Sequence, residues 1–279
     1  MGDADSVTGD SSRHVLRVAG VDVLSYLSGR RDGRPLADLA RPLMPVADAA
    51  PLILTAMPGW TLAADADAQP EVADSLTDAL IAGGASVARH VLGYTRDLRG
   101  ARPVDPGWAD PPLAHGLVLS ALTEVTIDLV ELNLRAFPSD HPDHIADERR
   151  VHDELAGLLE QEDLGPVLPG TAQVLLDGRA VAALVVNRFP GSAPYGGPWV
   201  TEVFRDPHPS ARGLGALLLR RAVAVLVAEG ETELSLAVTR GNPAVRTYER
   251  LGFTPTWDVR RLVLPGSVPD DDGEPVEAP

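Results

Sequence analysis

The sequence predicts an α/β fold in which strands and helices alternate along the chain. A strand-like run, Trp199–Phe204, is followed by a short turn with two glycines, Ser210–Gly215, and then by leucines and arginines at helical spacing. Two more strand-like runs, 172–177 and 180–188, meet at Asp177-Gly178, a dipeptide favoured in two-residue β-hairpins. A hairpin, a strand, a turn and a helix in this order indicate a sheet with a helix packed on it.

The first hundred residues are predicted to form a smaller region, in which residues 1–12 are disordered. Apolar runs indicate the strands, and the spacing of apolar residues after Pro70 indicates a helix that begins there. The predicted elements are a strand or short helix at 15–27, strands at 51–57 and 60–64, a helix from Pro70 and a closing strand at 87–98.

A larger region is predicted at 113–265, after a linker at 99–112 that holds four prolines and two glycines. Thr123 is expected to cap its first helix. Its other predicted elements are a strand at 117–119, helices at 123–136 and 147–160, the hairpin, the strand at 199–204, a helix to Glu229, a strand at 233–238, a helix at 244–251 and a strand at 256–264. Residues 266–279 are expected to form an acidic, loose tail.

The composition limits the class of protein and its partners. The chain has 279 residues, is 44% hydrophobic and carries a formal net charge of −16, so we expect a packed core and neither nucleic acid nor membrane as a partner. The absence of cysteine excludes disulfides and thiolate catalysis. The polar N-terminus lacks an apolar signal segment, so a cytoplasmic protein is expected. The absence of lysine and the abundance of alanine favour a bacterial source.

The turn before the predicted helix has the features of an anion-binding site. Glycine lets the backbone approach a ligand closely, and the first N–H groups of a helix point toward an anion. About thirty residues downstream comes Gly241-Asn-Pro-Ala-Val-Arg-Thr-Tyr-Glu-Arg-Leu-Gly-Phe253. The glycine turn alone is a moderately specific signal, whereas the two segments in this order and spacing are a strong one.

Together these segments resemble the GNAT acetyltransferase superfamily, whose members move an acetyl group from acetyl-CoA to an amine. The resemblance rests on Asp206-Pro207, on the turn, and on the pattern Asn-x-Ala-x-x-x-Tyr-x-x-x-Gly-Phe at 242–253; it departs at Ser210, where arginine or glutamine is usual. It implies a mixed, mostly antiparallel sheet flanked by helices, with acetyl-CoA as co-substrate.

The smaller region shows a weak internal similarity to the larger one. A strand, the helix from Pro70, Gly84 and a closing strand follow the same order as the strand at 234–238, the helix after Pro243, Gly252 and the last strand. We interpret 13–98 as a reduced, GNAT-like domain without catalytic function, because it lacks the asparagine, the tyrosine and the glycine turn. Any strand–helix–strand unit would show the same order, and this alternative stays open.

The resemblance assigns cofactor contacts to residues around the turn. It implies backbone contacts from Val203 and Arg205 to the pantetheine arm, and it surrounds the pyrophosphate with Arg212, Gly213, Leu214, Gly215, Ala216 and Leu217. Asn242 is expected to bind the cofactor, or alternatively to cap the helix that follows it. Arginines that would offset the negative net charge cluster in this part of the sequence: Arg205, Arg212, Arg220, Arg221, Arg240 and Arg246.

Two residues are candidates for proton transfer. Glu202, immediately before the cofactor contacts, is the candidate base, acting directly or through water; alternatively it pairs with an arginine. Tyr248 is the candidate acid that protonates the leaving thiolate of CoA; alternatively it is a core aromatic residue of an amphipathic helix.

The loop at 138–144 contains two histidines and two aspartates. A metal site needs three convergent ligands, so no metal is expected here. We expect the loop to line the acceptor side of the site, where Asp140 and His141 contact a cationic substrate.

These observations lead to one hypothesis and two alternatives. The hypothesis is an acetyl-CoA-dependent N-acetyltransferase that acetylates a primary amine of a small molecule by direct attack. The alternatives are a degenerate acyl-CoA-binding module with a regulatory or assembly role, and an enzyme with a hydroxyl acceptor. The sequence leaves open the identity of the acceptor and the oligomeric state, a homodimer included.

Overall fold

The computed structural model describes residues 13–31, 33–66, 69–100, 105–141, 143–160, 165–193 and 196–267. The predictions of a disordered segment at 1–12 and of a tail beyond 267 therefore lie outside the described residues. Within these ranges, no helix is both long enough and apolar enough to span a bilayer.

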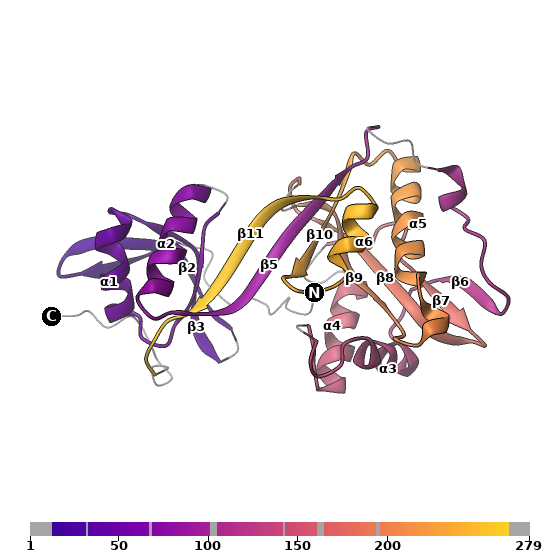
Figure 1. Cartoon of the computed structure of the whole chain (residues 1–279), viewed down its shortest axis with the longest axis horizontal. Helices are drawn as coiled ribbons and strands as arrows, with labels where there is room; N and C mark the ends of the chain where they lie inside the picture. Colours follow the sequence, from indigo (N-terminus) through magenta and orange to yellow (C-terminus); the bar gives the residue numbers. More distant parts are fainter. Residues whose placement is uncertain are drawn as a thin grey trace. The chain divides into compact units, whose positions relative to one another are not determined.

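The described residues form strands and helices in alternation (Figure 1). The strands are β1 (Arg13–Val18), β2 (Val21–Arg31), β3 (Arg34–Pro42), β4 (Thr61–Ala64), β5 (Ser86–Asp97), β6 (Leu117–Ala121), β7 (Ala172–Leu176), β8 (Arg179–Phe189), β9 (Gly197–Arg205), β10 (Glu233–Thr239) and β11 (Thr254–Val263). The helices are α1 (Val46–Ala56), α2 (Pro70–Ala82), α3 (Ile127–Ala136), α4 (Glu148–Glu160), α5 (Leu214–Ala228) and α6 (Val245–Arg250), with short 3₁₀ turns η1 (Pro106–Trp108) and η2 (Pro209–Ala211).

The strands are joined in one sheet with the order β1-β2-β3-β4-β11-β5-β10-β9-β8-β7-β6. Most neighbouring strands run antiparallel, as in the hairpin of β7 and β8 around Asp177-Gly178. The pairs β3/β4 and β9/β10 are parallel. The mixed, mostly antiparallel sheet with flanking helices that the resemblance implied is therefore confirmed.

The chain divides into two compact units, and the division is discontinuous. Among the described residues, the larger unit contains Leu92–Trp257, and the smaller unit contains those up to Val91 together with those from Asp258 onward. The boundaries expected from the sequence, 13–98 and 113–265, were contiguous and differ from this division. The difference arises because β5 and β11 each contribute residues to both units.

Helices cover both faces of the sheet in the larger unit. Side chains of β8 alternate between two hydrophobic clusters, as the period of a strand requires. Ala182 and Leu184 belong to the cluster beneath α5 and α6, whereas Ala183 and Val185 belong to the cluster beneath α3 and α4. The pair α5 and α6 and the pair α3 and α4 therefore lie on opposite faces of β8.

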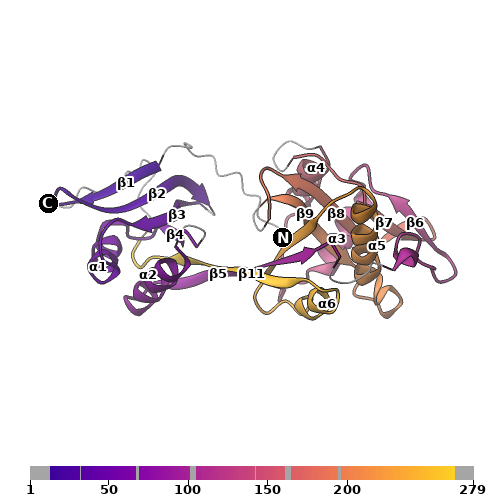
Figure 2. The same ribbon diagram turned by 90° about the horizontal axis from the view of Figure 1, so that it is seen from above.

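In the smaller unit, α1 and α2 cover one face of β1–β4 (Figure 2). The strand predicted at 51–57 is wrong, because these residues lie mostly in α1. The apolar run contains Pro51 and β-branched residues, yet the buried side chains are Ala49, Ala50, Ile53 and Ala56, which have helical spacing. The N-cap residue of α1 is Pro45, whereas that of α5 is Gly213, so α1 does not begin with a glycine turn like that of the larger unit.

The remaining differences from the sequence prediction are local. Residues 15–27 form parts of two strands that turn at Ala19-Gly20, and β3 has no counterpart in the prediction. Helix α3 begins at Ile127 rather than near Thr123, because the Thr126 hydroxyl accepts a hydrogen bond from the Leu129 N–H at 3.3 Å. The predicted positions of β4, α2, β5, α4 and the elements after residue 172 agree with the structure within a few residues.

We expect a fragment that begins at Pro112 to aggregate or to melt well below the full chain. Such a fragment lacks Tyr94 and Leu98, which are buried members of the core of the larger unit, and Trp108, which packs against that core. Uncovered apolar surface of this kind promotes association. Thermal melting and light scattering of the two proteins check this; a soluble fragment with the full-length melting temperature would contradict it.

Candidate active site

The site begins where β9 and β10 separate. Their parallel pairing consists of Trp199 with Ser235 and Val200 with Leu236, although β9 continues to Arg205 and β10 to Thr239. A β-bulge lies at the same point, because Val186 pairs with Val200 while Val185 pairs with Glu202, which leaves Thr201 as an extra residue.

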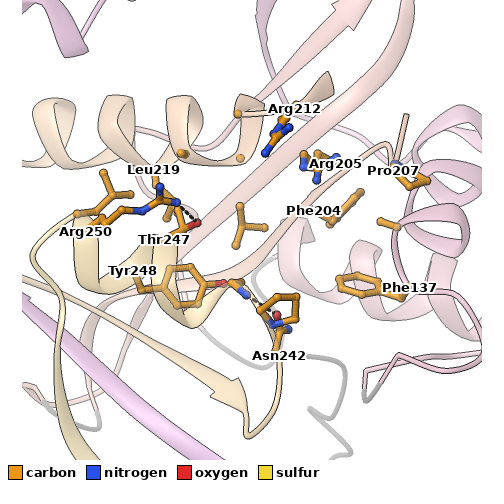
Figure 3. A pocket seen from close by; sticks show the side chains of 18 of the residues that line it. Phe137, Phe204, Arg205, Pro207, Arg212, Leu219, Asn242, Thr247, Tyr248 and Arg250 are labelled. Carbon is orange, nitrogen blue, oxygen red and sulfur yellow. Dashed lines mark hydrogen bonds between the residues drawn. The ribbon is translucent and has the colours of Figure 1, made fainter. Parts of the chain in front are cut away.

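Two cavities occupy the space next to this separation. The larger has a volume of about 660 Å³ and reaches from Phe137 to Arg250. It runs along β9, along the first turns of α5 and along α6 (Figure 3). The smaller, of about 30 Å³, lies between the diverging strands and is bounded by Val200, Thr201 and residues 236–239. Phe137, Val203, Asn242 and Tyr248 line both cavities, so the two adjoin each other.

The glycine turn stands at one wall of the larger cavity. Gly213 has φ 90°, in the left-handed region that favours glycine, and it is the N-cap residue of α5. Arg212, Gly213, Gly215 and Ala216 line the cavity. The side chain of Leu214 is buried in the core instead, so only its backbone remains a candidate contact. The Leu217 N–H donates to the Gly213 carbonyl at 3.0 Å and is used inside the helix.

The loop before the turn is held by Asp206. Its carboxylate accepts hydrogen bonds from the His208 N–H at 2.9 Å and from Arg135 at 3.1 Å. These interactions, the backbone N–H first, lower the pKa of Asp206. Ser210, where the sequence departs from the family pattern, bonds the His208 ring at 2.8 Å and supports the same loop.

Four arginines give the larger cavity a positive wall. Arg205, Arg212 and Arg220 line it as the sequence suggested, and Arg250 joins them. Arg250 donates to the Thr247 hydroxyl at 3.1 Å across α6 (Figure 3). Among the described residues around this cavity, Arg221, Arg240 and Arg246 are not part of its lining. Arg221 points instead to the Gly170 carbonyl.

Tyr248 is both a core residue and a cavity residue. It is 6% exposed and packs edge-on against Phe253, with ring centroids 6.2 Å apart. Its hydroxyl is directed to the side of the cavity where Asn242 and Phe137 lie (Figure 3). Burial raises the pKa of the phenol, and the charges of Glu202 and Asp143 raise it further. The phenol therefore keeps its proton at neutral pH.

Asn242 and Asp143 connect the two sides of the site. The Asn242 Oδ1 accepts from the Ala244 N–H at 2.9 Å. Ala244 is itself the N-cap residue of α6, so Asn242 supports the turn that leads into the helix rather than capping it. Its Nδ2 donates to Asp143 Oδ2 at 3.2 Å, and the Thr239 hydroxyl donates to Asp143 Oδ1 at 2.6 Å. Asp143 thus ties the loop after α3 to the end of β10. The sequence noted this aspartate only as a member of the loop.

Of the two loop residues predicted on the acceptor side, the structure places one in the cavity. His141 lines it and packs against Phe137 with the rings tilted by 56° and their centroids 4.9 Å apart. Burial lowers the pKa of its imidazole, against the opposing charge of Asp143. Its Nδ1 accepts from the Asp143 N–H at 3.1 Å, which leaves the proton of the neutral ring on Nε2. Asp140 is exposed, and the buried carboxylate of the loop is Asp143.

Glu202 lies on the opposite face of β9 from Val203. It is 7% exposed and lines a third, very small cavity with Phe137, Asp143 and residues of α3 and α4. Its charge nevertheless contributes to the raised pKa of Tyr248. In the parts of the chain described above, no three His, Asp or Glu side chains converge as metal ligands.

Comparisons with known proteins agree with this architecture. Residues 126–253 match the family described as "Acetyltransferase (GNAT) family". A curated relative, the mycothiol acetyltransferase of Clavibacter michiganensis subsp. michiganensis (strain NCPPB 382), is 33% identical over 172 residues, which cover 61% of this chain and 52% of that protein. The chain therefore matches about half the length of this relative.

Solved structures with a similar fold were also found. A GCN5-related N-acetyltransferase from Sphaerobacter thermophilus has a TM-score of 0.58 at 15% identity, over 89% of this chain and 79% of its own. A tandem GNAT protein from the clavulanic acid biosynthesis pathway has a TM-score of 0.51 at 19% identity, over 89% and 80%. These likenesses show the fold, and the fold shared with the tandem protein extends over 89% of this chain, so it includes much of the N-terminal region.

Proposed function

We propose that the protein transfers an acetyl group from acetyl-CoA to a primary amine of a small molecule by direct attack, because residues 126–253 match the GNAT acetyltransferase family. The observation that carries this proposal is the continuous cavity from the arginine-rich glycine turn to the buried phenol of Tyr248. One end of the cavity could bind the phosphates of acyl-CoA, and the other end could donate a proton to its sulfur. Transfer of the acyl group needs both.

The glycine turn is the proposed pyrophosphate site. The first turn of α5 leaves the N–H groups of residues 214–216 without intrahelical acceptors, and the helix dipole favours an anion there by roughly 0.3–1 kcal/mol. Arg205 and Arg212 add charge-assisted contacts. The pantetheine arm then follows β9 past Val203, where β10 no longer pairs with it, and brings the thioester to Tyr248.

Tyr248 is the proposed acid. The amine attacks the thioester carbonyl, the C–S bond breaks, and the sulfur leaves as a thiolate that takes the phenolic proton. The raised pKa of Tyr248 holds that proton until it is needed. Because Tyr248 is buried, a thiolate that forms beside its hydroxyl would also be poorly solvated, and this would raise the affinity of the thiolate for the proton.

Glu202 is the proposed base, acting directly or through water. An alkylammonium group has a pKa near 10.4, so its deprotonation at pH 7 costs about 4–5 kcal/mol. The buried carboxylates of Glu202 and Asp143 both lie near Tyr248 and together favour a cationic acceptor. Asp143 is already held by two donors, which makes it better suited to orient the loop than to accept a proton.

Replacing Glu202 with glutamine is expected to depress kcat/KM at neutral pH and to recover part of it at high pH. Free amine becomes abundant there, so the base matters less. Asp143→Asn is the matched comparison and is expected to lower activity without this pH-dependent recovery. The measurement is the pH profile of kcat/KM for the three proteins; identical profiles for wild type and Glu202→Gln would count against the base.

The function itself is tested with acetyl-CoA and a panel of amines. We expect acetyl-CoA to raise the melting temperature, calorimetry to give one site per chain, and an amine to release CoA that chromatography detects. Because one relative is named for mycothiol, acceptors related to mycothiol belong in the panel. Binding without CoA release for any acceptor would favour the regulatory module, and release with alcohols alone would favour a hydroxyl acceptor.

A further inference from the structure

Trp108 belongs to the segment after β5 that the sequence marked as a linker. It lies in η1, packs against the hydrophobic core of the larger unit and is only partly exposed. The 3₁₀ turn that carries it contacts α5. Trp108 also lies outside residues 126–253, the part of the chain that matches the family.

The indole ring of Trp108 contacts two guanidinium groups. The Cζ of Arg96 lies 5.5 Å and the Cζ of Arg220 lies 5.8 Å from the ring centroid, both within the range of cation–π attraction. Arg96 is buried and donates a hydrogen bond to the carbonyl of Leu251, at the end of α6. The ring is therefore connected to both helices that bound the cavity.

Arg220 is the member of this group that faces the cavity. It lines the cavity wall, as Leu251 does. It follows Leu214 by six positions, which is about 9 Å along the helix axis. A pyrophosphate bound at the first turn of α5 would therefore lie too far along the helix axis to occupy Arg220, and Arg220 would remain available for another anionic group of the ligand. An exposed arginine has many rotamers, and the indole face reduces their number.

We propose that Trp108 is a positioning residue that holds Arg220 for the 3′-phosphate on the ribose of CoA. This inference rests on the proposed function, since it takes CoA as the ligand. A guanidinium group is suited to the task because it stacks on an aromatic face and still presents its N–H donors to a phosphate. The segment between β5 and β6 then forms part of the nucleotide end of the cofactor site.

The test compares CoA with 3′-dephospho-CoA on the full-length protein by calorimetry. Trp108→Leu is expected to raise the Kd of CoA about twofold to fivefold, in line with an exposed cation–π contact, and to leave the Kd of dephospho-CoA unchanged. Trp108→Phe keeps a ring and is expected to retain most of the discrimination. Arg220→Gln is expected to remove the difference in Kd between CoA and dephospho-CoA. In a protein that already carries Arg220→Gln, adding Trp108→Leu is expected to change neither Kd further.

Trp257→Leu is the matched control. Trp257 stacks near Trp199 in the same unit, with centroids 6.5 Å apart, and lies outside the lining of the larger cavity. Its replacement is expected to leave the ratio of the two dissociation constants unchanged. A wild type that binds both ligands equally, or a Trp108→Leu protein that weakens both by the same factor, overturns the inference. A wild type that binds neither ligand overturns the proposed function itself.

Discussion

Replacing Tyr248 with phenylalanine is expected to lower kcat about 100-fold or more, while the affinity for CoA stays within a few-fold of wild type. The change removes one hydroxyl from a side chain that is buried against Phe253 and lines both cavities, so packing and cavity shape are kept. The lost group is the proton donor for the leaving sulfur. Steady-state kinetics with a productive amine, and calorimetry with CoA, measure the two quantities.

Tyr94→Phe is the control for this experiment. Tyr94 is a second buried tyrosine of the same hydrophobic core, and burial followed by the charge of Glu249 raises the pKa of its phenol. Tyr94 lies away from the lining of the larger cavity. Its loss is therefore expected to leave kcat within a few-fold of wild type. An unaltered kcat in Tyr248→Phe would make Tyr248 a packing residue and nothing more.

The raised pKa of Tyr248 also sets the expected pH dependence. The phenol stays protonated until the pH exceeds the ordinary tyrosine value near 10, because burial and two neighbouring carboxylates disfavour the phenolate. The wild-type rate is therefore expected not to fall through loss of this proton below about pH 10. If the wild-type rate rises with pH below about pH 10, that rise reports the deprotonation of the amine or of the group that acts as its base.

The glycine turn and the helix start beside the proposed cofactor site could be predicted from the sequence because their signals are local. A positive φ at Gly213 and a helix start at Leu214 depend on residues within a few positions of each other. The same holds for Asn242, whose side chain bonds the backbone two residues later. Hydrophobic periodicity identified α5 and the hairpin for the same reason.

The residues that sequence reasoning missed owe their roles to contacts distant in the chain. Asp143 is important because Thr239 and Asn242, about a hundred positions away, donate to it. Trp108 is placed by Arg96 and Arg220, and the apolar run with Pro51 lies in a helix because Ile53 and Ala56 pack into the core of the smaller unit. None of these contacts has a pattern in neighbouring residues. From the sequence of the loop at 138–144 alone, Asp140 was as good a candidate for the site as Asp143.

Replacing Gly213 with aspartate is expected to raise the Kd of acetyl-CoA by roughly 100-fold or more. The new carboxylate would stand at the N-terminus of α5, beside the proposed pyrophosphate site, where two like charges about 4 Å apart repel by roughly 4 kcal/mol near a protein surface. A Cβ at this position meets nothing within 4 Å, so the change does not clash with the core. Calorimetry on the folded protein measures the loss.

Gly213→Asn separates the charge from the backbone effect. Asparagine matches aspartate in size and bears the same strain at φ 90°, of order 1–3 kcal/mol for a non-glycine residue, but it adds no charge. We therefore expect the two variants to melt at similar temperatures, with Gly213→Asn keeping most of the affinity that Gly213→Asp loses. Equal loss in both would attribute the effect to strain in the turn. Unchanged affinity in a folded Gly213→Asp protein would remove the pyrophosphate from this turn altogether.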